Sequence, residues 1–173
     1  MAPQIVKAQS TPFKRQLGNV NSINKWAVQC RRCFKWRSIE NQKQFEVIRC
    51  KFVEDPFYCE KKNGVSCDDP ADLIYNASRT WVIDKPNLPR TPANFKRDLV
   101  LRRDHSKMDV YYVTPTGKRL RSITEAAQFL QENKDFSHLT LADFSFTSPK
   151  VMQDTVPDYV KRKGSSVNGR VLS

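Results

Sequence analysis

The 173-residue sequence has little glycine, little histidine and no long apolar run. Its 5 glycines form no glycine-rich phosphate-binding loop. Its 2 histidines, His105 and His138, belong to no recognisable motif for a nucleophile or a metal. No apolar stretch approaches the roughly 20 residues that a membrane span requires. We therefore expect neither an enzyme nor a membrane protein.

The start of the sequence also lacks the uninterrupted apolar segment that marks a secretory signal peptide. We expect a reducing compartment, where clustered cysteines are metal ligands more often than disulfides. Hydrophobic residues make up 39% of the chain, and the mean hydropathy is -0.64. This hydrophobic content is low for a single core in a chain of this length, so the composition favours small domains stabilised by a ligand.

Positive charge is what the sequence has in excess, with a formal net charge of +12. Residues 76–173 carry 17 Lys and Arg against 10 Asp and Glu, whereas residues 26–75 are nearly balanced at 9 against 8. An anionic polymer is therefore the expected partner, and the second half of the chain should contact it. The alternative is a basic protein without such a partner.

The pattern along the chain predicts four parts. Residues 1–24 lack periodicity and are predicted to be a disordered arm. Residues 25–75 contain every cysteine, and residues 76–149 form a second compact unit that begins with a proline-rich extended connector at 84–92. Residues 150–173 are predicted to be a flexible basic tail.

The second unit has readable strands and one helix. Residues 109–114 are β-branched and aromatic, which suits a strand, and residues 95–103 are predicted to be another. Thr114-Pro-Thr-Gly117 fits a type I turn that leads to a returning strand at 118–121. Strands followed by one helix predict an α+β fold.

The helix is predicted to begin after Ser122, which forms a capping box with Glu125. Its apolar face is expected to contain Ile123, Ala126, Ala127 and Leu130.

All 5 cysteines lie between residues 30 and 67. Cys30-Arg-Arg-Cys33 has the two-residue spacing that lets both sulfurs bind one ion from a tight turn. Structural zinc needs four ligands, and Cys59 and Cys67 lie near the prolines and glycine typical of turns. Cys50 lies in an apolar stretch, so we expect a small buried side chain there. The alternative is a set of unrelated buried thiols.

Basic residues concentrate around the predicted hairpin, with 9 Lys and Arg against 3 Asp between residues 88 and 122. Strand alternation places Asp109 and Tyr111 on one face, and Arg119 together with Arg121 on the next strand. Arg121 also adjoins the predicted helix start at Ser122, where free amides favour a phosphate. Arginine can grip guanine O6 and N7 together in the major groove.

The run Trp26-Ala-Val-Gln-Cys-Arg-Arg-Cys-Phe-Lys-Trp-Arg37 resembles the CW-type zinc finger, and the resemblance continues to about residue 75. It implies one structural zinc ion held by Cys30, Cys33, Cys59 and Cys67. Many members of that family bind a methylated lysine of the histone H3 tail in a cage of tryptophans, by cation–π attraction.

The cage residues here would be Trp26 and Trp36. Trp26 lies one residue upstream of the usual position, which Ala27 holds, and such a shift turns a strand side chain to the other face. We therefore expect weak or absent binding of a methylated H3 peptide.

The segment Asp109-Val-Tyr-Tyr-Val-Thr-Pro-Thr-Gly-Lys-Arg-Leu-Arg-Ser122 resembles the core of a methyl-CpG-binding domain, and the resemblance covers about residues 80–135. It implies double-stranded DNA as partner and Arg121 as one of two guanine-reading arginines. Arg102 or Arg103 would be the other, buttressed by Asp109. Tyr111 would lie near a methylated cytosine. Backbone phosphate contacts would come from Lys118 and Ser122.

The two resemblances together imply a nuclear, chromatin-associated transcriptional regulator of the kind found in plant methyl-CpG-binding-domain proteins. The loop from Arg103 to Asp109 is several residues shorter than in strong methyl-CpG binders, which predicts a modest preference for methylated CpG. The alternatives are a non-selective DNA binder whose finger reads histone H3 tails, and a protein-interaction subunit of a corepressor or histone deacetylase complex.

Overall fold

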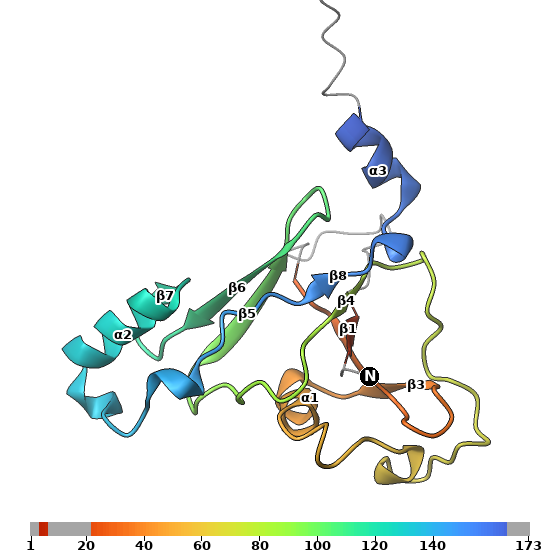
Figure 1. The fold of residues 1–173 in the computed structure, drawn as a ribbon, viewed down its shortest axis with the longest axis horizontal. Helices are drawn as coiled ribbons and strands as arrows, with labels where there is room; N and C mark the ends of the chain where they lie inside the picture. The colour runs from red at the N-terminus through yellow and green to blue at the C-terminus, as the bar shows by residue number, and fades with distance from the viewer. Residues whose placement is uncertain (1–3, 7–21, 166–173) are drawn as a thin grey trace, which may run out of the picture.

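The computed structural model describes residues 4–6 and 22–165, which fold into two antiparallel sheets with three α-helices (Figure 1). The strands are β1 (Gln4–Val6), β2 (Lys25–Gln29), β3 (Trp36–Ile39), β4 (Trp81–Ile83), β5 (Lys96–Leu101), β6 (Met108–Val113), β7 (Arg119–Leu120) and β8 (Lys150–Val151). The α-helices are α1 (Gln42–Arg49), α2 (Ile123–Glu132) and α3 (Asp158–Ser165). Short 3-10 turns occupy Cys59–Lys61, Lys134–Phe136, Leu141–Asp143 and Gln153–Thr155. Within the described ranges, no helix has the length and apolar character that crossing a bilayer requires.

The smaller sheet, in the order β5-β6-β7, confirms the strands and turn expected from the sequence. Burial alternates along β5 and β6, so one face of this sheet is buried and the other is partly exposed. The Gly117 amide donates to the Thr114 carbonyl over 2.9 Å, and Gly117 adopts a φ of 87°. The predicted hairpin turn is therefore present, with glycine where the backbone is left-handed.

Helix α2 covers the buried face of the smaller sheet, through Ala126 and Phe129. Its N-cap is Ser122, whose Oγ accepts from the Glu125 amide over 3.2 Å. The capping box expected from the sequence differs in its second half, because the Glu125 carboxylate accepts from the Arg121 amide. The expected apolar face also shifts, since Ile123 is 44% exposed.

The larger sheet has the order β3-β2-β1-β4-β8 and is built from distant parts of the chain. Strand β1 lies between β2 and β4, with Ile5 opposite both Trp26 and Val82. The expectation of a disordered arm over residues 1–24 is therefore wrong for residues 4–6, which pair on both sides. The rest of that arm up to residue 21 lies outside the described residues.

The expected flexible tail at 150–173 also contains regular structure. Strand β8 pairs with β4, and Lys150 lies opposite Ile83. Helix α3 follows after the buried Val156. The prediction of a flexible tail is therefore wrong for the described part of this segment, and residues 166–173 lie outside it.

One apolar core serves both halves of the chain. Its buried side chains include Val28 and Phe45 from the first half and Leu99, Tyr112 and Phe129 from the second. The proline-rich segment at 84–92 joins these halves while packing against α1, since the Asn87 amide donates to the Arg49 carbonyl over 2.8 Å. The two halves consequently form one packed body.

A buried ionic cluster ties the sheets together at Asp84, directly after β4. Its carboxylate accepts from Arg49 of α1 over 2.6 Å and from Arg97 of β5 over 2.9 Å. The side chains of all three residues are at most 1% exposed. One further nitrogen of each arginine donates to backbone: Arg49 to the Pro89 carbonyl over 2.7 Å and Arg97 to the Thr147 carbonyl over 3.3 Å. Buried charges of this kind are tolerated because each is paired.

Replacing Asp84 with Ala should destabilise the protein by about 3–5 kcal/mol, because two arginines stay buried without a carboxylate. Urea unfolding followed by tryptophan fluorescence and by metal release measures this, and both signals should shift together. The control is Asp55→Ala, which removes an exposed carboxylate paired with Lys51 and Lys61. Equal stability of the two variants would contradict the role assigned to Asp84.

Candidate functional site

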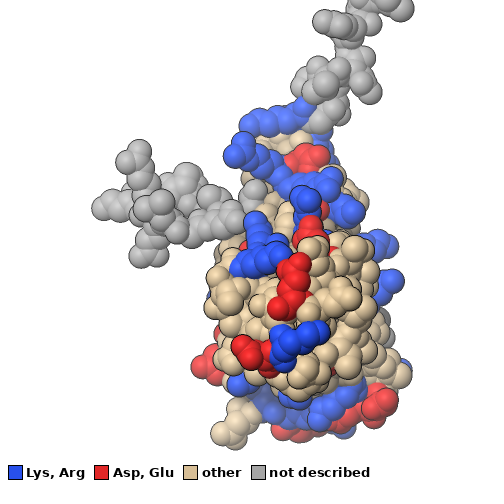
Figure 2. All heavy atoms as spheres, turned by 90° about the vertical axis from the view of Figure 1, so that its left-hand side faces the viewer, with Lys and Arg blue, Asp and Glu red and all other residues tan. Residues whose placement is uncertain are grey.

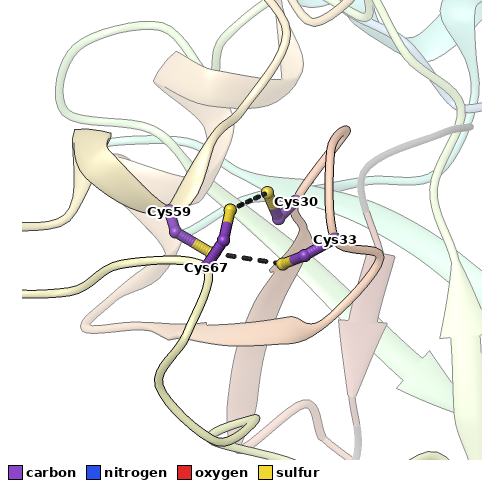
Figure 3. A group of neighbouring side chains, drawn as sticks. All are labelled: Cys30, Cys33, Cys59 and Cys67. Carbon is purple, nitrogen blue, oxygen red and sulfur yellow. Dashed lines mark hydrogen bonds between the residues drawn. The ribbon is translucent and has the colours of Figure 1, made fainter.

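Four cysteines from two loops converge at one point beside β2 and β3 (Figure 3). Cys30 and Cys33 come from the turn after β2, whereas Cys59 and Cys67 come from the long loop after α1. The Sγ atoms of Cys30 and Cys67 are 3.8 Å apart, and those of Cys33 and Cys59 are 3.6 Å apart. All four sulfurs lie within 4.8 Å of one another.

These separations fit zinc, because four thiolates at about 2.3 Å from a tetrahedral ion lie about 3.8 Å from each other. Burial raises the pKa of Cys30, but hydrogen bonds from the backbone of Cys33, Arg32 and Cys59 lower that pKa to about 6. Burial raises the pKa of Cys59 to about 12 and raises that of Cys67 as well, so these thiols would lose their protons on binding the metal. A thiolate is the form that a metal binds. The four cysteines would hold one structural zinc ion and leave no open position for catalysis.

Arg37 organises the loop that carries two of the cysteines. Its guanidinium is fully buried, and its Nε donates to the Cys59 Sγ over 3.1 Å. Its two other nitrogens donate to the carbonyls of Ser66, Asp69 and Pro70 and to the Asp72 carboxylate. All five guanidinium donors are thereby used. Sequence reasoning missed this role, because a buried arginine has no distinct sequence pattern.

Cys50 is not part of the cluster, as expected, but its environment differs from the prediction. It is the C-cap residue of α1 and is partly exposed, and its Sγ donates to the Val47 carbonyl over 3.2 Å. An apolar stretch in the sequence indicated burial, whereas the buried face of α1 belongs to Phe45, Glu46 and Arg49.

The two tryptophans expected to form a methyl-lysine cage do not face each other. In the pairing of β2 with β3, Trp26 lies opposite Ile39 and Trp36 lies opposite Gln29, so the two rings are on opposite faces of the sheet. Trp26 packs against Phe45 with ring centroids 5.1 Å apart. This part of the site prediction is wrong, and the cause is the one-residue displacement of Trp26.

Trp36 is covered by aromatic neighbours on its own face. The ring of Trp81 lies 5.0 Å from the rings of both Trp36 and Tyr75. Trp81 is fully buried, and Trp36 is only 7% exposed. The position where a methylammonium group would contact Trp36 is therefore filled by protein.

The exposed face of the smaller sheet carries a row of charged and aromatic side chains. Asp109 and Tyr111 project from the central strand β6, opposite Val100 and Asp98 of β5. Arg119 of β7 stacks over the Tyr111 ring at 3.6 Å from its centroid, and it donates to Asp98 over 3.0 Å. The stack fixes the orientation of the Tyr111 ring on this face.

Arg102, just after β5, is held by Asp109 through two hydrogen bonds. Its Nε and Nη2 donate to the two carboxylate oxygens over 3.1 and 3.0 Å. The hydrogen bonds and charge of Asp109 raise the pKa of Arg102. Arg103, the other candidate for this position, is exposed, and its guanidinium has no hydrogen bond or ion pair with a described residue. Asp109 therefore distinguishes two adjacent arginines that the sequence could not separate.

Arg121 is held in a similar way by Glu125 of α2. Its Nε donates to the Glu125 carboxylate over 2.9 Å, and its amide donates to the same group over 2.9 Å. The hydrogen bond from the Arg121 backbone and then that from its guanidinium lower the pKa of Glu125, so this carboxylate stays ionised. The pairing of Arg121 with Glu125 was missed because the sequence assigned Glu125 to capping alone.

The remaining predicted residues lie beside this pair. Lys118 is exposed in the turn before β7. The Oγ of Ser122 already accepts from the Glu125 amide, so the hydroxyl proton is what it can offer to a ligand.

The segment between Arg102 and Asp109 is a tight turn closed by its own hydrogen bonds. The His105 amide donates to the Arg102 carbonyl over 2.9 Å, and the Ser106 amide donates to the Asp104 carboxylate over 3.0 Å. His105 has a φ of 57°, and its Nδ1 lies 2.8 Å from the Thr80 Oγ1. This contact anchors the turn against the segment that precedes β4.

Four cysteines that could hold one zinc ion, together with a sheet face that carries carboxylate-held arginines, fit a zinc-containing DNA-binding protein. Two family models match the chain: the CW-type zinc finger at residues 26–73 and the methyl-CpG binding domain at residues 81–154. The chain belongs to the methyl-CpG-binding-domain family of proteins, and its zinc finger confirms the expected structural zinc.

Similar proteins are found in Arabidopsis thaliana. Methyl-CpG-binding domain-containing protein 4 is 54% identical over 154 residues, which cover 89% of this chain and 83% of that relative. Methyl-CpG-binding domain-containing protein 1 is 59% identical over 136 residues, covering 79% of this chain and 67% of that relative. No solved structure matches the chain.

Zinc should be lost from Cys59→Ser and retained by Cys50→Ser. Metal binding is coupled to folding on the order of 10 kcal/mol or more, so the loss should also unfold the finger. Native mass spectrometry of the single variants counts the bound ion. Retention of zinc by Cys59→Ser together with its loss from Cys50→Ser would overturn the ligand assignment.

A histone H3 peptide carrying methylated lysine should bind no better than the unmethylated peptide, because the face of Trp36 is covered. Calorimetry with both peptides is the measurement, with Trp26→Ala as the control. A low-micromolar affinity for the methylated peptide that disappears in Trp26→Ala would show that a cage forms around that ring.

Proposed function

We propose that this protein is a nuclear transcriptional regulator that reads CpG steps of double-stranded DNA through the exposed face of the smaller sheet. Arg102 and Arg121 carry the recognition, and the observation that supports it is that each is held by its own carboxylate. The protein acts by binding and not by catalysis, and its zinc ion is structural.

Two arginines suit a CpG step because that step contains two guanines, one on each strand. Each guanine presents O6 and N7 in the major groove, and a guanidinium can donate to both at once. Asp109 occupies Nε and Nη2 of Arg102, which leaves Nη1 and the second proton of Nη2 for a base. Glu125 occupies Nε of Arg121, which leaves both Nη groups. Each carboxylate thus orients a donor pair before DNA arrives, and this reduces the entropy lost on binding.

Tyr111 lies on the same exposed face of the smaller sheet and is proposed to contact the cytosine methyl groups. Its ring is fixed by Arg119, which we assign to positioning rather than to base contact because Tyr111 and Asp98 already engage it. Lys118 and the Ser122 hydroxyl are proposed to contact phosphate. Because the turn after Arg102 is short and anchored through His105, few contacts flank the methyl groups, and we propose a methylation preference below about tenfold.

The alternative is a subunit of a corepressor or histone deacetylase complex that uses both modules to bind proteins, histone H3 tails among them. The covered face of Trp36 favours DNA over methylated tails as the ligand. A DNA titration separates the two functions, since the alternative requires no affinity for a duplex.

Arg102→Ala and Arg121→Ala should each weaken a CpG duplex about tenfold or more while changing a CpG-free duplex little. Arg103→Ala is the matched control, because it removes an adjacent arginine that no carboxylate holds. Lys118→Ala should weaken every duplex alike and reduce the slope of log affinity against log salt by about one. Fluorescence anisotropy at several salt concentrations gives all four results.

The same titration compares methylated with unmethylated CpG. A hundredfold preference for the methylated duplex would refute the role given to the short turn. Absence of binding to any duplex at low salt would refute DNA reading and favour the protein-interaction alternative.

A further inference from the structure

Helix α3 is a basic element that the family model for the DNA-binding domain does not include, since that model ends at residue 154. Lys161, Arg162 and Lys163 are consecutive and exposed on it. Asp158 in its first turn lies 3.8 Å from the Lys161 ammonium at the surface, and DNA phosphate would compete for that group. The helix is anchored at its start, because Val156 is buried and Val160 packs against the main core.

The helix projects from the body at the end where β5 turns into β6 (Figure 1). Hydrogen bonds join the two regions. His105 of the β5–β6 turn contacts Thr80, and the next residue, Trp81, donates its amide to the Thr155 Oγ1 over 2.9 Å. Thr155 lies three residues before α3 begins. The position of α3 beside the turn is therefore fixed by buried contacts.

The β5–β6 turn is itself basic and directly continues the proposed reading face. Arg102, Arg103 and Lys107 are exposed there, and Lys107 lines the same surface depression as Tyr111 and Arg121. Figure 2 shows Lys and Arg side chains gathered toward the upper end of the molecule, where α3 projects, with Asp and Glu more frequent lower down. Basic side chains thus lie both on the β5–β6 turn and on α3, with Asp104 and Asp158 among them.

We propose that α3 is a second DNA contact, which binds the phosphate backbone of the duplex next to the CpG step held by the sheet. This inference rests on the proposed function and extends it. We place the duplex along β5 and β6, so that the backbone flanking the step continues past the β5–β6 turn toward α3. Lysine and arginine side chains on an exposed helix suit phosphate, because they need no base-specific geometry.

A phosphate contact from α3 would compensate for the DNA contacts that the short β5–β6 turn cannot make. Phosphate contacts fix register and supply affinity, whereas base contacts supply specificity. In this protein the helix supplies affinity beside the step, and Arg102 with Arg121 supply specificity. Removal of the helix charges should therefore reduce affinity without changing the ratio between CpG and CpG-free duplexes.

The test is a triple variant of the full chain, Lys161→Gln, Arg162→Gln and Lys163→Gln, which keeps good helix-forming residues. Its charge-matched control is Lys43→Gln, Lys51→Gln and Lys61→Gln, which removes exposed lysines around α1 and the zinc loop. Zinc content and circular dichroism establish that both variants fold. Both are titrated by anisotropy with a 20-base-pair duplex, with and without a central CpG, at several salt concentrations.

The α3 variant should lower the salt slope by about 2 to 3 on both duplexes equally, because each phosphate that the helix neutralises adds about 0.9 to that slope. The control variant should change the slope by less than one. Equal slopes for the α3 variant and the wild type would overturn the inference, and retained sensitivity to Arg121→Ala would show that the proposed function still stands. If the wild type itself fails to bind, both the inference and the proposed function are wrong.

Discussion

The buried carboxylate of Asp84 is the constraint on which the arrangement of the molecule depends. It lies between Arg49 of α1, in the zinc-binding half, and Arg97 of β5, in the DNA-binding half, and water reaches none of the three side chains. A buried charge is stable only while it keeps its ion-pair partners. If either half moved away, an arginine would be left buried without a carboxylate or would become exposed to water. The relative position of the zinc finger and the smaller sheet is thereby fixed.

The consequence for function is that the zinc finger acts as part of the scaffold. Strand β1 pairs with both β2 and β4, so the sheet of the zinc finger includes β4. Asp84 lies directly after β4. Thr80, directly before β4, contacts His105 in the turn beside Arg102. A zinc ion held by the four cysteines would join the two loops that Arg37 contacts through Cys59, and Trp36 packs on Trp81 of β4. In a zinc finger that folds alone, the face of Trp36 would be open to a ligand. In this protein that face joins the zinc finger to the second half of the chain.

Sequence patterns predicted the local features well. These features depend on residues that are close in the chain: the two-residue spacing of Cys30 and Cys33, the turn at Thr114–Gly117 and the alternation of burial along β6. Features formed by long-range pairing were not predictable: β1 has three residues and pairs with β2 and β4, which come from distant parts of the chain. Buried arginines are another case, because a count of charges along the sequence does not show that Arg37, Arg49 and Arg97 are buried. The choice between Arg102 and Arg103 likewise required the position of Asp109.

We propose that Arg102 and Arg121, each oriented by a carboxylate, read one CpG step from a rigid scaffold. Nuclear magnetic resonance of the arginine Nε–Hε groups tests it most directly, with the protein titrated by a duplex containing one CpG and by an isomeric duplex in which that step is GpC. We expect the Arg102 and Arg121 signals to shift and sharpen only with the CpG duplex, while that of the buried Arg37 stays in place. Identical shifts with both duplexes, or shifts confined to other arginines, would contradict it.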